Sequence, residues 1–183
     1  GSRIDDGRVR AASIVYDSSG NEVTRYDKIH MFDAQVADNQ GAYLESRSFE
    51  PGNSIVVAEC PIGTVGLSVC YDLRFPELYR ELLTAGATAF AIPSAFTETT
   101  GSAHFELLMR ARAVENTCFT IASCQGGVHD SGRRTYGHSM VVDPWGEVIG
   151  RLGKGEGVLT VELDLVQQRN LRKAMPFQAQ RRL

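Results

Sequence analysis

The sequence has few lysines, no long apolar run and no large excess of charge of either sign. Its 19 basic residues include only three lysines, at positions 28, 154 and 173, and 22 acidic residues bring the formal net charge to −3. Proteins that bind nucleic acid or anionic membranes usually carry a basic excess, which is missing here. The longest apolar stretches, such as 65–70, fall far short of the roughly 20 residues that span a bilayer. We therefore expect neither a nucleic-acid partner nor a membrane partner.

The cysteines are few and scattered, which argues against a disulfide framework or a zinc site. Their spacings of ten, forty-eight and six residues match no zinc pattern, and the histidines form no paired cluster with them. Three of the four lie in apolar, strand-like runs, which is typical of buried free thiols. No signal peptide opens the chain, so the sequence predicts a reduced, cytoplasmic protein without a metal site. The cysteines are Cys60, Cys70, Cys118 and Cys124.

The composition is that of an ordinary globular domain. The chain of 183 residues is 43% hydrophobic and 22% charged, which is close to the average of such proteins. That length suffices for one hydrophobic core and is short for two domains. We therefore expect residues 1–183 to form one domain, or part of one.

Apolar periodicity predicts helices packed on a mixed sheet. The period changes after Cys70, where a helix begins at Pro76 and ends at Gly86. Alternation of strands and helices in the middle of the chain implies right-handed crossovers, and flanking hairpins make the sheet mixed. A long irregular loop is expected over 33–48. Further helices are expected at about 102–116 and 165–174, and strands at 11–16, 22–26, 54–58, 65–69, 88–92, 118–123, 139–142, 147–151 and 158–163.

Cys70 is the sharpest local feature, because it ends a buried strand just before a helix. A thiol on such a turn lies at the sheet edge, near helix amides that favour a thiolate. The same geometry places a backbone N–H beside the sulfur, where it can stabilise an oxyanion. The alternative is an ordinary buried thiol.

A thiol nucleophile needs a proton acceptor and a positive group near the tetrahedral intermediate. Lys28 ends the second expected strand and is a candidate cation, although a solvated strand end is the commoner setting for lysine. Spacing alone does not bring Lys28 to Cys70. A cysteine–histidine hydrolase is disfavoured, because neither His30 nor His104 has an orienting partner that the sequence identifies.

Several motifs together resemble the nitrilase (carbon–nitrogen hydrolase) superfamily in order and spacing. They are residues 26–33, Glu45 ahead of Pro51-Gly52, 69–77, 93–96 with 100–101, 104–106, 110–116 and 136–146. The match runs over nearly the whole chain and is most similar to the Nit branch, in particular to deaminated glutathione amidases, with omega-amidases next. The resemblance implies an α/β fold, a four-layer αββα sandwich of which this chain would cover about the C-terminal two thirds.

The resemblance also assigns roles to individual residues. Cys70 would be the nucleophile, Lys28 the cation beside the oxyanion, and Glu45 a supporting second glutamate. The backbone N–H of Tyr71 would complete the oxyanion site. No metal or organic cofactor is implied, and family members usually assemble as homodimers or larger homo-oligomers.

One family feature is missing. The general base of the family is a glutamate well upstream of the lysine, but only 27 residues precede Lys28. Their acidic residues, Asp5, Asp6, Asp17, Glu22 and Asp27, do not occur in the expected setting. We therefore expect either an N-terminally incomplete domain or an inactive remnant, and the intact remaining motifs favour the incomplete domain.

Arg74 carries the prediction about the substrate. It follows Cys70 by four residues, where a guanidinium could bind a carboxylate bidentately; the alternative is an ion pair with Asp72 or Glu77. The resemblance implies that Arg74, Phe96 and Thr100 form a pocket for an α-keto or carboxylate end, with core packing as the alternative for Phe96. The charged residues of the second helix are expected to form salt bridges. They are His104, Glu106, Arg110, Arg112 and Glu115.

The sequence therefore predicts an amidase that hydrolyses the carboxamide of a small carboxylate or α-keto amide to an acid and ammonia through a cysteine acyl-thioester. One alternative is an omega-amidase acting on 2-oxoglutaramate-type ω-amides, and another is a carbamoylase. A non-catalytic binding or assembly module on the same fold is the alternative from another class, and the missing glutamate favours it.

Overall fold

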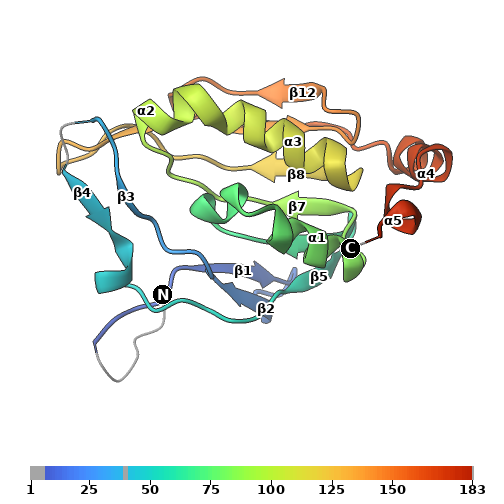
Figure 1. Cartoon of the computed structure of the whole chain (residues 1–183), viewed down its shortest axis with the longest axis horizontal. Helices are drawn as coiled ribbons and strands as arrows, with labels where there is room; N and C mark the ends of the chain where they lie inside the picture. Colours follow the sequence, from blue (N-terminus) through green and yellow to red (C-terminus); the bar gives the residue numbers. More distant parts are fainter. Residues whose placement is uncertain (1–6, 39–40, 183) are drawn as a thin grey trace.

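The computed structural model describes residues 7–38 and 41–182 and is built around a six-stranded sheet (Figure 1). Three adjacent strands run parallel, β6 (Gly63–Leu67), β7 (Ala89–Ala91) and β8 (Phe119–Ala122), while the pairs on both sides are antiparallel. The mixed sheet expected from the sequence is therefore confirmed. In spatial order its strands are β12 (Val148–Arg151), β11 (Met140–Val142), β8 (Phe119–Ala122), β7 (Ala89–Ala91), β6 (Gly63–Leu67) and β5 (Val57–Cys60).

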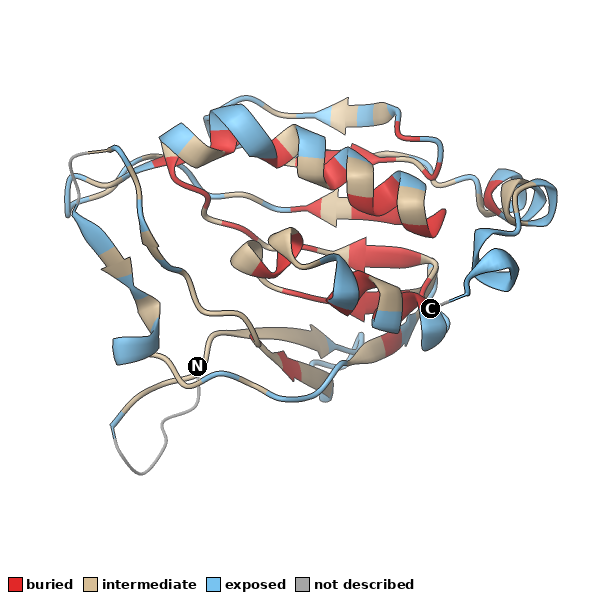
Figure 2. Cartoon of the chain, viewed as in Figure 1, coloured by how far each residue is buried: buried red, intermediate tan, exposed pale blue. Residues whose placement is uncertain are grey.

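Two helices, α1 (Pro76–Thr84) and α3 (Glu106–Asn116), cover one face of this sheet (Figure 1). The apolar period of α1 buries Leu78, Tyr79, Leu82 and Leu83, as the sequence predicts. Figure 2 shows the buried residues gathered on the central strands and on the sides of both helices that face them. Full burial of a side chain such as Leu82 contributes roughly 1.5–3 kcal/mol to stability.

The helix expected from residue 102 begins earlier and is not regular. It starts as a short helix α2 (Glu98–Thr100), widens into a π-helical turn over Gly101–Phe105 and then continues as α3. A Cβ on Gly101 would lie 2.3 Å from the Cβ of Tyr136. The missing side chain therefore lets the wide turn pack directly on β10 (Arg134–Tyr136), which pairs with β9 (Gly126–Val128).

The charged side chains of α3 have structural partners, most of which lie on other elements. Glu106 forms an ion pair with Arg151 of β12, and Arg110 donates to the carbonyl of Gly146. Only Arg112 pairs within the helix, with Glu115 at 2.9 Å. Among the described residues, the salt bridges expected at helix spacing are confirmed for Arg112 with Glu115 alone, because Glu106 pairs with another element and Arg110 binds a backbone carbonyl.

The expectation of an irregular loop over 33–48 is wrong. The segment contains a short antiparallel hairpin, β3 (Asp33–Gln35) with β4 (Ala42–Leu44), followed by a 3-10 helix η1 (Glu45–Arg47). Strands of three residues are too short to show a clear alternation of apolar and polar residues. The expected hairpin before it is present as β1 (Ala12–Tyr16) and β2 (Glu22–Asp27).

The strand expected over 158–163 is not formed, because β-propensity alone does not make a strand without a pairing neighbour. The helix expected next, α4 (Leu165–Ala174), is present with the predicted bounds, and the short helix α5 (Phe177–Gln180) follows it. Both helices lie at the opposite end of the molecule from the β3–β4 hairpin (Figure 1). In the described part of the chain, no helix is both long and apolar enough to cross a membrane.

Candidate active site

A cavity of about 780 Å³ lies where the parallel strands β6, β7 and β8 end. Backbone hydrogen bonds continue the sheet past these ends, from Cys70 N to Pro93 O and from Ser94 N to Ser123 O, each 2.9 Å. The three segments that directly follow these strands are thus held side by side. The β3–β4 hairpin forms another wall of the cavity. The carboxyl ends of parallel strands are a common location for ligand sites in α/β proteins.

All of the site residues predicted from the sequence line this one cavity. They come from the residue after β2, the 3-10 helices η1 and η2 (Cys70–Arg74), the loop after β7, and α2. The structure therefore brings together residues that lie far apart in the sequence, and their chemical roles remain predictions. They are Lys28, Glu45, Cys70, Tyr71, Arg74, Phe96 and Thr100.

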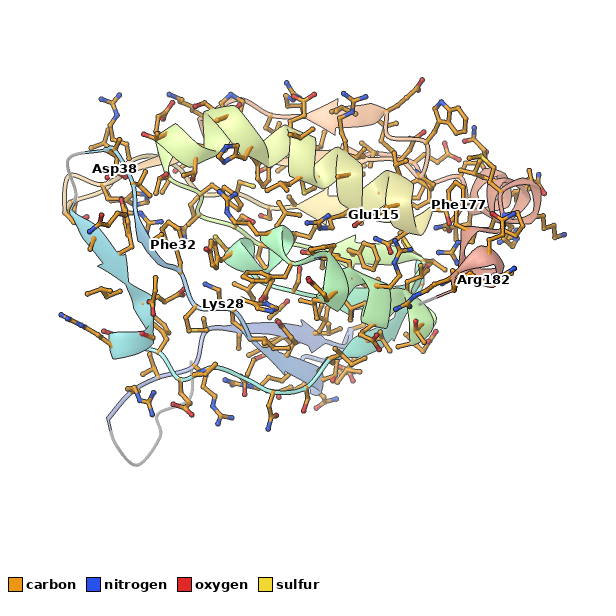
Figure 3. The ribbon with its side chains drawn as sticks, viewed as in Figure 1. Lys28, Phe32, Asp38, Glu115, Phe177 and Arg182 are labelled. Carbon is orange, nitrogen blue, oxygen red and sulfur yellow. The ribbon has the colours of Figure 1, made fainter. Side chains whose placement is uncertain are left out.

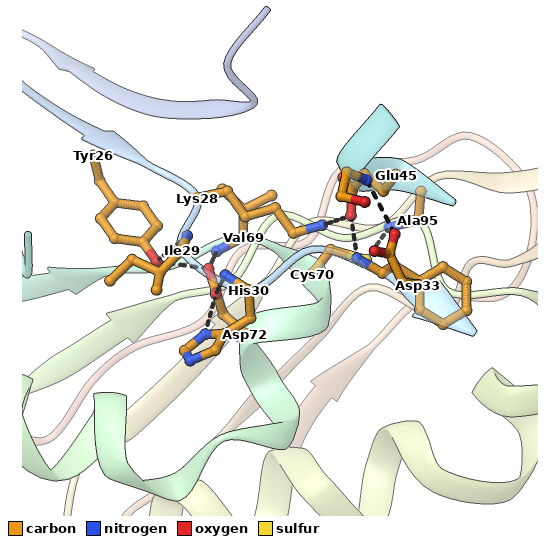
Figure 4. Close-up of polar contacts among 12 residues, drawn as sticks. Tyr26, Lys28, Ile29, His30, Asp33, Glu45, Val69, Cys70, Asp72 and Ala95 are labelled. Atoms are coloured by element: carbon orange, nitrogen blue, oxygen red, sulfur yellow. Dashed lines mark hydrogen bonds and ion pairs between the residues drawn. The ribbon is translucent and has the colours of Figure 1, made fainter. Parts of the chain in front are cut away.

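Cys70 sits on a sharp turn directly after β6. Its backbone φ of +51° lies in the left-handed region, which is rare for residues other than glycine and costs about 1–3 kcal/mol. The turn presents the thiol to the cavity, where the backbone N–H of Ala95 donates to Sγ at 3.5 Å (Figure 4). This geometry matches the strained strand-to-helix turns that expose nucleophiles.

Burial raises the pKa of the Cys70 thiol above its ordinary value. The Ala95 N–H and the charges of Lys28 and Arg133 lower the pKa, whereas the charge of Glu45 raises it, and burial outweighs the lowering contributions. The expectation that the turn favours a thiolate is therefore wrong in its net effect. The thiol stays protonated at neutral pH and needs a base to become a nucleophile.

Lys28 is 3% exposed, so the alternative of a solvated strand end is wrong. Its Nζ lies 2.5 Å from Oε2 of Glu45, which also accepts the backbone N–H of Phe32 at 2.5 Å. Figure 3 places Lys28 and Phe32 between the β3–β4 hairpin and the central strands. The β2 end is held by Gly52, whose N–H donates to the Lys28 carbonyl. Only glycine fits at position 52, because a Cβ there would lie 2.2 Å from the backbone carbonyl oxygen of Asp27.

Asp72 joins the segment that carries Lys28 to the turn that carries Cys70. Its fully buried carboxyl group accepts hydrogen bonds from Tyr26 Oη (2.8 Å), Val69 N (2.8 Å) and His30 N (3.1 Å), and lies 2.7 Å from His30 Nδ1 (Figure 4). The alternative of an ion pair between Arg74 and Asp72 is wrong, because these partners occupy the carboxyl group.

The histidines behave differently from the sequence-based expectation. His30 does have an orienting carboxyl partner, Asp72, and stacks on Phe75 with ring centroids 3.7 Å apart. Sequence spacing could not show this contact across 42 residues. However, neither His30 nor His104 is among the described residues that line the cavity. The arrangement therefore offers no cysteine–histidine pair at the cavity.

Arg74 lies over two aromatic rings and forms no ion pair with Glu77. Its guanidinium carbon is 5.8 Å from the ring centroid of Tyr71 and 5.5 Å from that of Phe96, and Nη2 lies 3.3 Å from His104 Nδ1. Phe96 is 7% exposed and contacts Phe105, so it is both a cavity wall and a core residue. The Thr100 hydroxyl lies 2.9 Å from that of Thr97 at the start of α2.

The lining residues that sequence reasoning missed include Phe32, Tyr43, Ala95 and Arg133. Ala95 acts through its backbone N–H, which no side-chain pattern reveals, although the 93–96 motif pointed to the segment. Arg133 precedes β10 and donates from Nη2 to the Ala95 carbonyl at 2.6 Å, and nothing local in the sequence indicated this. In the part of the chain that the structure describes, no group of three or more His, Cys, Asp or Glu is placed to hold a metal ion, and the four thiols are free.

A family model described as carbon-nitrogen hydrolase matches residues 1–173. The chain belongs to the carbon–nitrogen hydrolase family. It is 44% identical over 175 residues to the deaminated glutathione amidase of Yersinia enterocolitica, covering 96% of this chain and 61% of that protein. It is 45% identical over 170 residues to the human deaminated glutathione amidase, covering 92% of this chain and 52% of that protein. The chain thus spans about half to three fifths of these relatives.

Solved structures agree with this family and its fold. The Caenorhabditis elegans NitFhit protein superposes with a TM-score of 0.91 at 40% identity over 97% of this chain and 43% of that chain. Saccharomyces cerevisiae Nit3, a member of the nitrilase superfamily, gives a TM-score of 0.85 at 33% identity over 97% of this chain and 62% of that chain. The nitrilase-type α/β fold expected from the sequence is confirmed.

The raised pKa predicts the pH dependence of Cys70 alkylation. Because only the thiolate reacts, the rate of iodoacetamide labelling should rise at higher pH than the rate for N-acetylcysteine in the same tube. Glu45→Gln removes a charge that raises this pKa and should move the profile to lower pH. Peptide mass spectrometry measures the rate, with buried Cys118, whose pKa is raised to about 12, as an unreactive internal control. A Cys70 profile at or below that of N-acetylcysteine would contradict this assignment.

Asp72→Asn is expected to loosen the link between Lys28 and Cys70. An amide cannot accept all the donors that face this buried site, so the free energy of unfolding should fall by about 1–3 kcal/mol. The Cys70 alkylation profile should move further up in pH, because the Lys28 charge is no longer held near the sulfur. Urea unfolding and labelling measure the two effects. Asp17→Asn, at an exposed turn, is the matched control; equal results for both variants would refute the role of Asp72.

Proposed function

We propose that the protein is a thiol-dependent amidase in which Cys70 forms an acyl-thioester. The observation that carries this proposal is the placement of Cys70, Lys28 and Glu45 in one cavity, with the thiol on a strained turn. Membership of the carbon–nitrogen hydrolase family and relatives named deaminated glutathione amidase support it.

In the proposed reaction, the Cys70 thiolate attacks the amide carbon, and the carbonyl oxygen becomes an oxyanion. The Lys28 ammonium and the N–H of Tyr71 stabilise that oxyanion in a cavity with aromatic walls. Glu45 holds Lys28 in position through its 2.5 Å contact. The C–N bond then breaks, the amine leaves with a proton, and water hydrolyses the thioester to release the acid and regenerate the thiol.

The reaction needs a general base, because burial raises the pKa of the Cys70 thiol. Glu45 is the only carboxylate among the described residues that line the cavity, and its Oε2 already accepts from Lys28 and from Phe32 N. We therefore assign Glu45 a supporting role. The base glutamate is proposed to come from outside this lining, which accords with the proposal that residues 1–183 form part of a larger hydrolase domain.

For the substrate, we propose a small carboxylate or α-keto amide whose acid end binds Arg74 beside Phe96 and Thr100. A deaminated glutathione-like compound is the first candidate, because the relatives carry that name. Omega-amides of the 2-oxoglutaramate type and carbamoyl compounds would use the same nucleophile. A non-catalytic binding module remains the candidate from another class. The hydrogen bonds of Glu45 to Lys28 and Phe32 N favour it, because they leave this carboxylate unsuited to act as the base. A cytoplasmic location and assembly as a homodimer or larger are further proposals.

The test measures amide hydrolysis by the protein produced from its whole gene. Short α-keto ω-amides and deaminated glutathione are supplied, and the acid and amine products are quantified. Cys70→Ser should abolish hydrolysis, by at least about a thousandfold. Cys60→Ser is the matched control, because Cys60 ends β5 and does not line the cavity. If Cys70→Ser retains wild-type rates, Cys70 is not the nucleophile, and no hydrolysis of any amide would favour the binding module.

A further inference from the structure

His104 is in contact with the cavity arginine, Arg74, although it lies outside the described cavity lining. Nη2 of Arg74 lies 3.3 Å from Nδ1 of His104, and among the described residues the Arg74 side chain has no other hydrogen-bond or ion-pair partner. A guanidinium has five N–H donors and no acceptor, so Nδ1 must be the acceptor in this contact. The imidazole that makes it is therefore neutral, with its proton on Nε2.

The aromatic rings next to Arg74 hold its guanidinium without fixing its direction. The guanidinium carbon lies 5.8 Å from the ring centroid of Tyr71 and 5.5 Å from that of Phe96. The attraction between a cation and a ring comes from the whole ring face, so it restrains the distance of the group more than its rotation. A hydrogen bond is directional. The contact with His104 is thus the one that selects which N–H groups of Arg74 remain for a ligand.

The π-helical turn over Gly101–Phe105 places His104 beside Arg74. Phe105 is 1% exposed and contacts Phe96 with ring centroids 5.1 Å apart, and Phe96 is also a ring next to Arg74. The turn and the 3-10 helix η2 are therefore joined twice, once through the rings and once through His104 Nδ1. π-helical turns are rare and occur frequently at functional sites.

The exposure of His104 argues against a role in holding the fold together. Its side chain is exposed, unlike that of the neighbouring Phe105. A hydrogen bond at an exposed position competes with water and contributes little to the free energy of unfolding. The consequence of the contact is therefore expected in the direction of the Arg74 guanidinium and not in the stability of the protein.

We propose that His104 is a positioning residue, which accepts from Nη2 of Arg74 and thereby turns the other donors of the guanidinium toward the substrate carboxylate. This inference rests on the proposed function, in which Arg74 binds the acid end of the substrate. Two parallel N–H donors bind a carboxylate bidentately, and a guanidinium that rotates freely presents them less often. His104 acts only through Arg74 and does not touch the substrate.

The first measurement is ligand binding to Cys70→Ser protein produced from its whole gene. Calorimetry compares glutaramate, a carboxamide with a carboxylate at its other end, with the methyl ester, which lacks the charge. His104→Phe keeps a flat ring but removes the acceptor, so it should weaken binding of glutaramate by about 3- to 10-fold and leave the ester within about twofold. Ala103→Phe, at the neighbouring exposed position of the same turn, is the matched control and should change neither.

Further variants separate positioning from a merely structural role. His104→Asn should keep the affinity for glutaramate within about twofold, because its Oδ1 can take the place of Nδ1 and accept the same N–H. In an Arg74→Gln background, His104→Phe should cause no further loss, since the two residues act as one unit. With Cys70 intact, His104→Phe should raise KM for glutaramate more than it lowers kcat.

Several results would overturn the inference. They are equal weakening by His104→Phe and His104→Asn, no weakening by His104→Phe, equal weakening for glutaramate and its ester, or a loss that persists with Arg74→Gln. Binding of glutaramate no tighter than that of the ester before any change at His104 would overturn it as well. Hydrolysis is assayed separately with Cys70 intact. The expected binding pattern without hydrolysis of any amide would reject the proposed function and leave the role of His104 standing.

Discussion

The buried carboxyl group of Asp72 is the contact on which the geometry of the site depends. It accepts from Tyr26 on β2, from the backbone of His30 just beyond Lys28, and from Val69 just before Cys70. A polar group without solvent access is unfavourable unless its hydrogen bonds are complete. The segments that carry the cation and the thiol are therefore held together by one group. The remaining cavity walls, from the β3–β4 hairpin to the loop after β7, surround the two segments that Asp72 holds together.

Opposing effects act on the pKa of the Cys70 thiol in the cavity. Burial keeps the Cys70 thiol protonated, whereas Lys28, Arg133 and the Ala95 N–H favour the thiolate. In the proposed reaction, such a thiol needs a proton acceptor, and the cations then stabilise both the thiolate and the oxyanion that it generates. The left-handed backbone of Cys70 adds strain at the same point. The surrounding sheet tolerates this strain because backbone bonds fix the turn on both sides.

The sequence identified elements with long apolar periods and missed those defined by pairing. Helix α1 follows from periodicity and from Pro76 and Gly86 at its ends, but the β3–β4 hairpin and the absence of a strand over 158–163 depend on neighbours. The gathering of Lys28, Glu45 and Cys70 was predicted from motif resemblance, because spacing carries no information on their distance. The contact of His30 with Asp72 spans 42 residues, and that of Arg133 with Ala95 spans 38. Neither leaves a local signal.

The central claim is that Cys70 becomes acylated by an amide. The most direct measurement mixes the protein with a deaminated glutathione-like amide, quenches the reaction with acid in the first turnover, and locates the added acyl mass by peptide mass spectrometry. The account predicts a hydroxylamine-labile acyl group on Cys70 alone, although the thiol of Cys124 also belongs to a residue that lines the cavity. Hydrolysis of the amide with no acyl group on Cys70, or with the group on Cys124, would contradict the account.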